Sequence, residues 1–259
     1  MPWPVPAIVA AGVFYFFGGR GLAHRDWRRE ASFYLGIAVL IAAVDSPIDW
    51  DADKHFWVHM TQHVLLMMVA PPLLLLGRPW PRLLRPLPRG VRLPVAREVL
   101  AGATLGPARA VARWLASPWP AFVLFNGTLL AWHVPALYDL TLRNAAVHEL
   151  EHTLFLGTAL LLWVHLLPST RPQLSDGQRV AYGTGALLVS WILALVLGVG
   201  AHPFYSQYPS LTDQQIAAGI MWVPGSIPFC VALAFAVYRW LDPEPRRRRT
   251  SPVLRPREI

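Results

Sequence analysis

The stretch HFWVHMTQHVLLMMVAPPLLLLG (residues 55–77) contains no aspartate, glutamate, lysine or arginine. An apolar run of about 20 residues is long enough to cross the hydrocarbon core of a bilayer as one helix. The predicted span within this stretch covers residues 57–77, and comparable runs lie near residues 5–22, 31–47, 119–138, 147–167, 180–200 and 216–240. Of the 259 residues, 54% are hydrophobic and 15% are charged, whereas soluble domains carry about 25% charged residues. The sequence therefore predicts an all-α membrane protein, a bundle of seven transmembrane helices.

The distribution of arginine predicts how these helices are oriented. Arginines are concentrated in residues 20–29, 78–117 and 239–257, which all fall on one side of a seven-span arrangement. The connections on the other side are mainly acidic, with Asp45, Asp49, Asp51, Asp53, Asp139 and Asp213 against Lys54 and Arg143. Because basic loops stay in the cytoplasm, we expect the N-terminus outside and the C-terminus in the cytoplasm. The predicted domains are a membrane domain over residues 1–245 and a basic cytoplasmic tail over residues 246–259.

The long connection 78–117 has eight arginines against a single acid, Glu98. Prolines at 79, 81, 86 and 88 predict an irregular first part, and residues 95–115 can form a basic helix. We expect this segment to lie on anionic lipid at the cytoplasmic face; a solvated basic loop is the alternative. Because the net charge of +8 is located in such loops, we expect no nucleic-acid partner.

Seven of the nine histidines fall in the predicted outer layer: His55, His59, His63, His133, His148, His152 and His202. Residues four apart share one face of a helix, so 55, 59 and 63 form a stripe and 148 and 152 form a pair on a second helix. Neutral imidazoles from two facing helices can bind copper or zinc. The spacing therefore predicts a metal site near the outer face. His24 and His165 fall on the cytoplasmic side and have no predicted role.

Sulfur-containing residues offer fewer candidates. Met60, Met67 and Met221 are possible thioether ligands that would favour cuprous ion, but Met60 points off the histidine stripe and membrane methionines usually serve packing. Cys230 is the only cysteine, which excludes a disulfide within the chain and a cysteine-rich metal site.

Several alternatives to a copper site remain open. The segment HELEH (residues 148–152) matches the H-E-x-x-H pattern of zinc proteases, with Glu149 as the nominal general base, and also the inverted H-x-x-E-H pattern. Two imidazoles from facing helices can ligate haem iron, and single histidines can simply form hydrogen bonds between helices. Copper transport across the membrane is disfavoured, because the middle of each predicted span is almost purely apolar.

Several blocks of the sequence resemble one known family. They are HMTQH (59–63) with PPL (71–73) and GRP (77–79), WHVPALYD (132–139), HELEH (148–152) with Trp163, and DQQ (213–215) with Gly219 and MWVPG (221–225). Together these blocks extend over most of residues 45–240. They resemble the CtaG-like assembly factors of the bacterial caa-type cytochrome c oxidase.

The resemblance implies a multi-pass protein of the bacterial plasma (inner) membrane, with cytochrome c oxidase subunits as partners and copper insertion as its role. The matching blocks contain five candidate metal ligands, with Met221 as a secondary one: His59, His63, His133, His148 and His152. We therefore predict an assembly factor or metallochaperone, not an enzyme, that binds copper near the outer face and delivers it to the oxidase. In this hypothesis the 59/63 and 148/152 pairs form the site and His133 caps it. Zinc and haem are the alternatives to copper as the bound group.

Overall fold

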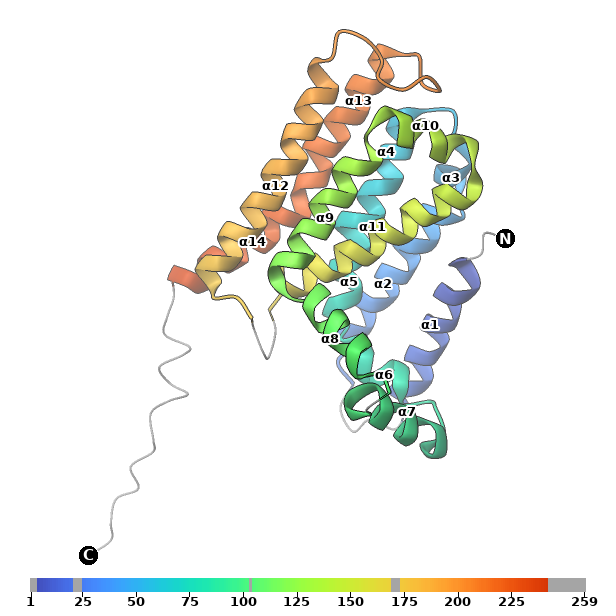
Figure 1. Cartoon of the computed structure of the whole chain (residues 1–259), viewed down its shortest axis with the longest axis vertical. Helices are drawn as coiled ribbons and strands as arrows, with labels where there is room; N and C mark the ends of the chain where they lie inside the picture. Colours follow the sequence, from blue (N-terminus) through green and yellow to red (C-terminus); the bar gives the residue numbers. More distant parts are fainter. Residues whose placement is uncertain (1–3, 21–24, 103, 169–172, 242–259) are drawn as a thin grey trace, which may run out of the picture.

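The computed structural model describes residues 4–20, 25–102, 104–168 and 173–241, and all regular structure in those ranges is helical (Figure 1). The longer helices are α1 (Pro4–Gly19), α2 (Trp27–Val44), α9 (Pro118–Trp132), α11 (Ala145–Leu166) and α12 (Asp176–Val199). Two further stretches are composite: α4 (Phe56–Val64), η1 (Leu65–Val69) and α5 (Ala70–Leu76), then α13 (Leu211–Trp222), η2 (Pro224–Ser226) and α14 (Ile227–Leu241). Short helices complete the fold: α3 (Pro47–Ala52), α6 (Pro79–Leu84), α7 (Arg89–Ala101), α8 (Gly106–Leu115) and α10 (Pro135–Arg143).

The prediction of an all-helical membrane protein is confirmed. Among the described residues, four helical stretches are long and apolar enough to span a bilayer: Trp27–Ala52, Phe56–Leu76, Asp176–Val199 and Leu211–Leu241. A fifth is added if α9 and α10, which meet at 75°, count as one broken span. The number of seven spans and the orientation of the termini stay predictions, and the predicted tail 246–259 lies outside the described residues.

The helices form a bundle whose two ends differ in charge. In Figure 1, α2, α4, α5, α9 and α11 occupy the centre, α12 to α14 lie on one flank and α1 lies on the other. The arginine-rich helices α6, α7 and α8 lie at one end, and α3, α10 and the loop after α12 lie at the opposite end. The basic connection is thus separated by the length of the bundle from the acidic ones, as the charge pattern requires.

The central helix α4–η1–α5 is interrupted at mid-length. Pro71 and Pro72 have no N–H groups, so the carbonyl of Met67 has no backbone donor in either an α-helical or a π-helical register. The indole of Trp163 on α11 donates to that carbonyl at 2.9 Å. A neighbouring helix thereby satisfies the carbonyl that the prolines leave open. The residues just before the prolines adopt the π-helical turn η1, and the bond fixes α11 against this helix.

The fourth predicted run, 119–138, is shorter in the structure because the helix breaks near its C-terminal end. Helix α9 ends at Trp132, with His133 as its C-cap, and Val134 has an extended backbone (φ −66°, ψ 124°). Proline disfavours the helical conformation of the residue before it, and Pro135 begins α10 in a new direction. The break places His133 at the corner between the two helices.

Two expectations for residues 78–117 hold only in part. The proline-rich start is irregular only over residues 85–88, whereas α6 runs from Pro79 to Leu84, because proline is tolerated in the first turn of a helix. The predicted single helix over 95–115 is divided into α7 and α8, since Gly102 ends α7 in an extended conformation (φ −62°, ψ 145°). The side chains of Val95, Val99 and Leu100 lie outside the described residues. Contact with anionic lipid remains a prediction; Val111 and Trp114 on α8 are exposed.

Candidate metal centre

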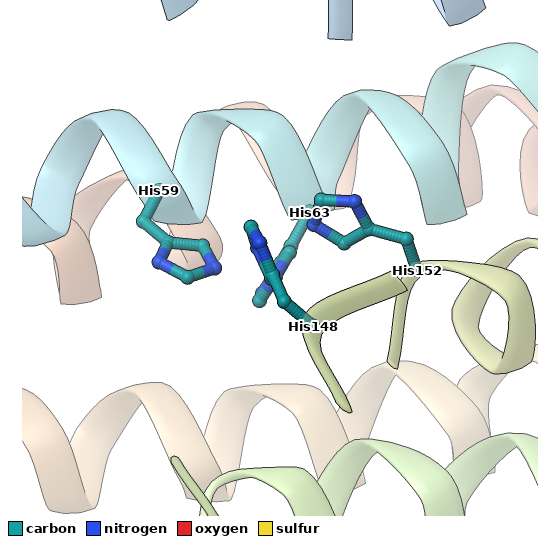
Figure 2. A group of neighbouring side chains, drawn as sticks. All are labelled: His59, His63, His148 and His152. Atoms are coloured by element: carbon teal, nitrogen blue, oxygen red, sulfur yellow. The ribbon is translucent and has the colours of Figure 1, made fainter. Parts of the chain in front are cut away.

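Four histidine side chains converge between α4 and α11 (Figure 2). His59 and His63 come from α4, His148 and His152 come from α11, and one ring nitrogen of each lies within 4.8 Å of the others. The ring centroids are 4.4 Å apart within the α4 pair and 4.1 Å apart within the α11 pair. The i, i+4 spacing read from the sequence has therefore placed the two pairs on facing sides of adjacent helices. We refer to these residues as the four-histidine group.

The group is close to the dimensions of a metal site. Tetrahedral coordination with bonds of 2.0–2.1 Å to nitrogen requires ligand nitrogens about 3.4 Å apart. The four nitrogens, which lie within 4.8 Å of one another, would have to approach by at most about 1.4 Å to meet that requirement. Three of the four residues, His59, His63 and His152, are buried, and His148 is partly exposed. An ion would therefore be enclosed on most sides and reachable past His148.

Tyr208 determines which nitrogen of His59 faces the group. The Tyr208 hydroxyl donates to the carbonyl of Ala52 and lies 3.1 Å from Nδ1 of His59. Because its proton is already donated, the hydroxyl accepts from Nδ1–H, and Nε2 of His59 carries the lone pair that a metal needs. Burial, followed by nearby carboxylates such as Asp53 and Asp213, raises the pKa of the Tyr208 phenol above its ordinary value. The phenol therefore keeps its proton and this arrangement holds at neutral pH.

Five buried ring nitrogens of the group lack protein partners in the described structure. Nε2 of His59, His148 and His152 and both ring nitrogens of His63 are buried and make no hydrogen bond with the described protein atoms. Buried polar groups are almost always hydrogen-bonded, because an unpaired one costs about 1–3 kcal/mol. A cation held by these nitrogens would satisfy them. The donor set thus fits copper or zinc, both of which imidazole binds readily.

A carboxylate lies against the group. Glu151 is fully buried, and its Oε1 is 3.8 Å from Nε2 of His63. Both of its oxygens are buried, and the Thr141 side chain lies near them. The sequence interpretation gave Glu151 no role beyond the motif, although positions 148, 151 and 152 share one helix face. Its anionic form would offset part of the charge of a bound cation.

Glu149 is the nominal base of the H-E-x-x-H pattern. It lines an apolar groove of about 450 Å³ between α11 and helices α1 and α2, which His152 also lines. Glu149 follows His148 directly, so its side chain leaves the helix about 100° around the axis from that of His148. Of the two carboxylates in the motif, the one next to the histidines is therefore Glu151.

His133 lies beside the four-histidine group without belonging to it. Its ring centroid is 6.4 Å from that of His63. Its Nδ1 is 2.7 Å from the carbonyl of Leu129, which can only accept, so Nδ1 carries the proton and Nε2 carries a lone pair. Nε2 is buried and has no protein partner. The predicted capping role of His133 stays a prediction.

The remaining histidines are not brought together with the group. His55 is exposed and extended (φ −134°, ψ 121°), so α4 begins after it and the predicted stripe loses its first member. His202 is exposed in the loop after α12. His165 lies toward the other end, where its Nε2 contacts the carbonyl of Ala116 at 3.0 Å, and His24 lies outside the described residues.

Comparison with known proteins gives one strong match. The family model described as cytochrome c oxidase caa3 assembly factor (Caa3_CtaG) matches residues 13–242. Two curated relatives, the Mycobacterium bovis protein named Uncharacterized protein Mb0105 and the Mycobacterium tuberculosis protein named Uncharacterized protein MT0111, are each 26% identical over 228 residues. The match includes 82% of this chain and 34% of each relative, so the chain spans about a third of their length. No solved structure matches.

Proposed function

The chain belongs to the cytochrome c oxidase caa3 assembly factor family, and from this premise we propose that it binds copper in the four-histidine group and delivers it to a copper centre of the oxidase. Copper is the cargo in this proposal, and the oxidase subunits are the partners. The observation that carries it is the convergence of four imidazole nitrogens, two from α4 and two from α11, within 4.8 Å of one another. The protein would act as a metallochaperone and not as an enzyme.

The residues around the group suit reversible binding. Tyr208 holds His59 with its Nε2 lone pair toward the ion, and Glu151 offsets positive charge in a buried site. His148 is the least buried of the four. We expect the ion to enter and leave on that side, exchanging one imidazole at a time, since a closed and saturated site would retain it.

The proposal places the group near the outer face of the bacterial plasma membrane. Its residues belong to α4 and to the first turns of α11, and α4 lies toward α3 and α10, away from the arginine-rich helices α6 to α8 (Figure 1). With basic segments in the cytoplasm, seven spans would put the N-terminus and the histidines outside and the C-terminus inside. Helix α8 would then rest on anionic lipid.

Copper content of the oxidase tests delivery. Cells that carry His148→Ala/His152→Ala in place of the native chain should assemble an oxidase depleted in copper, whereas cells with the outer-histidine control His55→Ala/His202→Ala should not. Immunoblots must show equal amounts of both variants in the membrane. An oxidase with full copper content in the first strain contradicts the proposal.

One observation favours a second candidate, a zinc peptidase of the H-x-x-E-H type: Glu151 lies beside His63. A peptidase loses its reaction when the general base is replaced, whereas a carrier without Glu151 still binds and delivers metal, only less tightly. Cleavage of membrane proteins that stops in Glu151→Gln, together with unchanged oxidase copper, would support the peptidase. A Soret band in the purified protein would instead indicate haem.

A further inference from the structure

All the methionines after Met1 line one small cavity. The chain has five methionines, and the structure brings four of them around a space of about 20 Å³ together with two histidines: Met60, Met67, Met68, Met221, His63 and His133. Each of these methionines is no more than 6% exposed. They come from α4, η1 and α13, so segments far apart in the sequence converge on one point.

The cavity has features that packing alone does not require. A volume of about 20 Å³ holds one particle the size of a water molecule. His133 is 6% exposed, and its Nε2 has no hydrogen-bond partner. Both ring nitrogens of His63 are likewise without partners. Leucine side chains would fill such a space equally well, so packing does not require methionine here. Packing also does not require buried imidazoles, whose nitrogens are costly to bury without a partner.

We propose that this cavity is a second metal site, selective for a soft monovalent cation such as cuprous ion. Thioethers are soft ligands that favour copper(I) over zinc(II), while an imidazole binds either. The ligands would be His133 through Nε2 and two or more of the methionine sulfur atoms. A monovalent ion in a cavity with so few polar groups also carries the least charge to be desolvated.

His63 connects the two sites. It belongs to the four-histidine group and also lines the methionine cavity. A cuprous ion can move between the sites by exchanging imidazole ligands for thioethers, with His63 bound throughout. The oxidation state does not change, so no electron donor is needed. The role of this second site in delivery rests on the proposed function, whereas the site itself rests only on the cavity and its residues.

Selenium spectroscopy tests the site in the intact protein. In selenomethionine-labelled protein loaded with cuprous ion, four of the five selenium atoms line the cavity. We expect selenium K-edge spectra to show a copper neighbour that disappears when a cuprous chelator is added. Selenium spectra without a copper neighbour at two equivalents of bound cuprous ion would overturn the proposal.

The binding of two different ions, silver(I) and zinc(II), distinguishes this site from the four-histidine group. Silver(I), a redox-stable substitute for cuprous ion, should bind the wild-type protein at two equivalents and zinc(II) at one. The volume-conserving variant Met67→Leu/Met221→Leu should lose one equivalent of silver and keep its zinc. His148→Ala/His152→Ala should lose the zinc and keep one silver. Unchanged silver binding in the methionine variant would overturn the second site, while zinc bound equally by all the variants would contradict the four-histidine group instead.

Discussion

The hydroxyl of Tyr208 lies 3.1 Å from Nδ1 of His59, and the two residues are 149 positions apart in the chain. The phenol donates its proton to the Ala52 carbonyl and accepts from the imidazole, which leaves Nε2 of His59 available to a metal. A loop that precedes α13 therefore sets the tautomer of a ligand on α4. Hydrogen bonds of this kind to metal-binding histidines raise metal affinity.

Replacing Tyr208 by phenylalanine should weaken metal binding while the bundle still folds. We expect a loss of about 10–100-fold in affinity, the usual effect of removing the hydrogen-bond partner of a metal ligand. Competition with a chelator of known affinity measures it. The control is Tyr182→Phe, which removes another buried hydroxyl that makes no hydrogen bond in the described structure. Equal loss in both variants would show a general packing effect.

Replacing Glu151 by glutamine should weaken binding of a divalent ion, because the amide keeps the shape of the side chain and removes its negative charge. We again expect about a 10–100-fold lower affinity. Glu149→Gln is the matched control on the same helix and should bind metal like the wild type. A larger loss in Glu149→Gln than in Glu151→Gln would contradict the placement of the two carboxylates.

Asp213 should contribute to stability by capping the helix that carries half of the site. Its carboxylate accepts from the backbone N–H groups of Phe56 and Trp57, at 2.8 and 3.0 Å. Loss of such a cap costs about 0.5–2 kcal/mol, so Asp213→Ala should lower the midpoint of thermal unfolding in detergent. Asp51→Asn removes an exposed ion pair with Lys54 and should leave the midpoint nearly unchanged. A similar decrease in both variants would argue against the cap.

Replacing Trp163 by phenylalanine should destabilise the bundle, because it leaves the Met67 carbonyl buried without a donor. The expected cost is about 1–3 kcal/mol, measured as a lower unfolding midpoint. Trp119→Phe is the control, since Trp119 is exposed. A destabilisation confined to Trp119→Phe would contradict this account of the proline-containing helix.

The orientation of the chain can be tested by cysteine labelling, because Cys230 is the only cysteine. In a Cys230→Ala background, Ser206→Cys should react with a membrane-impermeant maleimide in intact cells. Arg89→Cys should react only after lysis. Both positions are exposed in the structure, so accessibility itself is matched. The reverse pattern would place the histidines in the cytoplasmic half.

The parts of this protein that sequence patterns could predict are those set by local periodicity. Apolar runs identified the helices, and the i, i+4 spacing identified both histidine pairs, since neighbouring turns of one helix fix their geometry. Proline at position 135 disfavours a helical Val134, but the 75° turn after α9 depends on how α10 packs over α11. Residues 79–84 were wrongly expected to be irregular because proline is compatible with a first helical turn.

The remaining features depend on contacts between distant segments. Nothing in the spacing of Tyr208 indicates that it reaches His59, and nothing in the spacing of Met221 indicates that it joins Met67 and His133 around one cavity. Glu151 was overlooked because the motif drew attention to Glu149, although helix geometry alone places Glu151 on the histidine face. Long-range packing decides such contacts.

The most direct test of the central claim is the cupric ion content of protein purified in detergent and then dialysed. The wild type and the control His55→Ala/His202→Ala should each retain one equivalent of copper(II) with nitrogen hyperfine splitting in its paramagnetic resonance spectrum. The variant His59→Ala/His63→Ala/His148→Ala/His152→Ala should retain none. Equal copper in all three proteins, or none in any of them, would contradict a copper site in the four-histidine group.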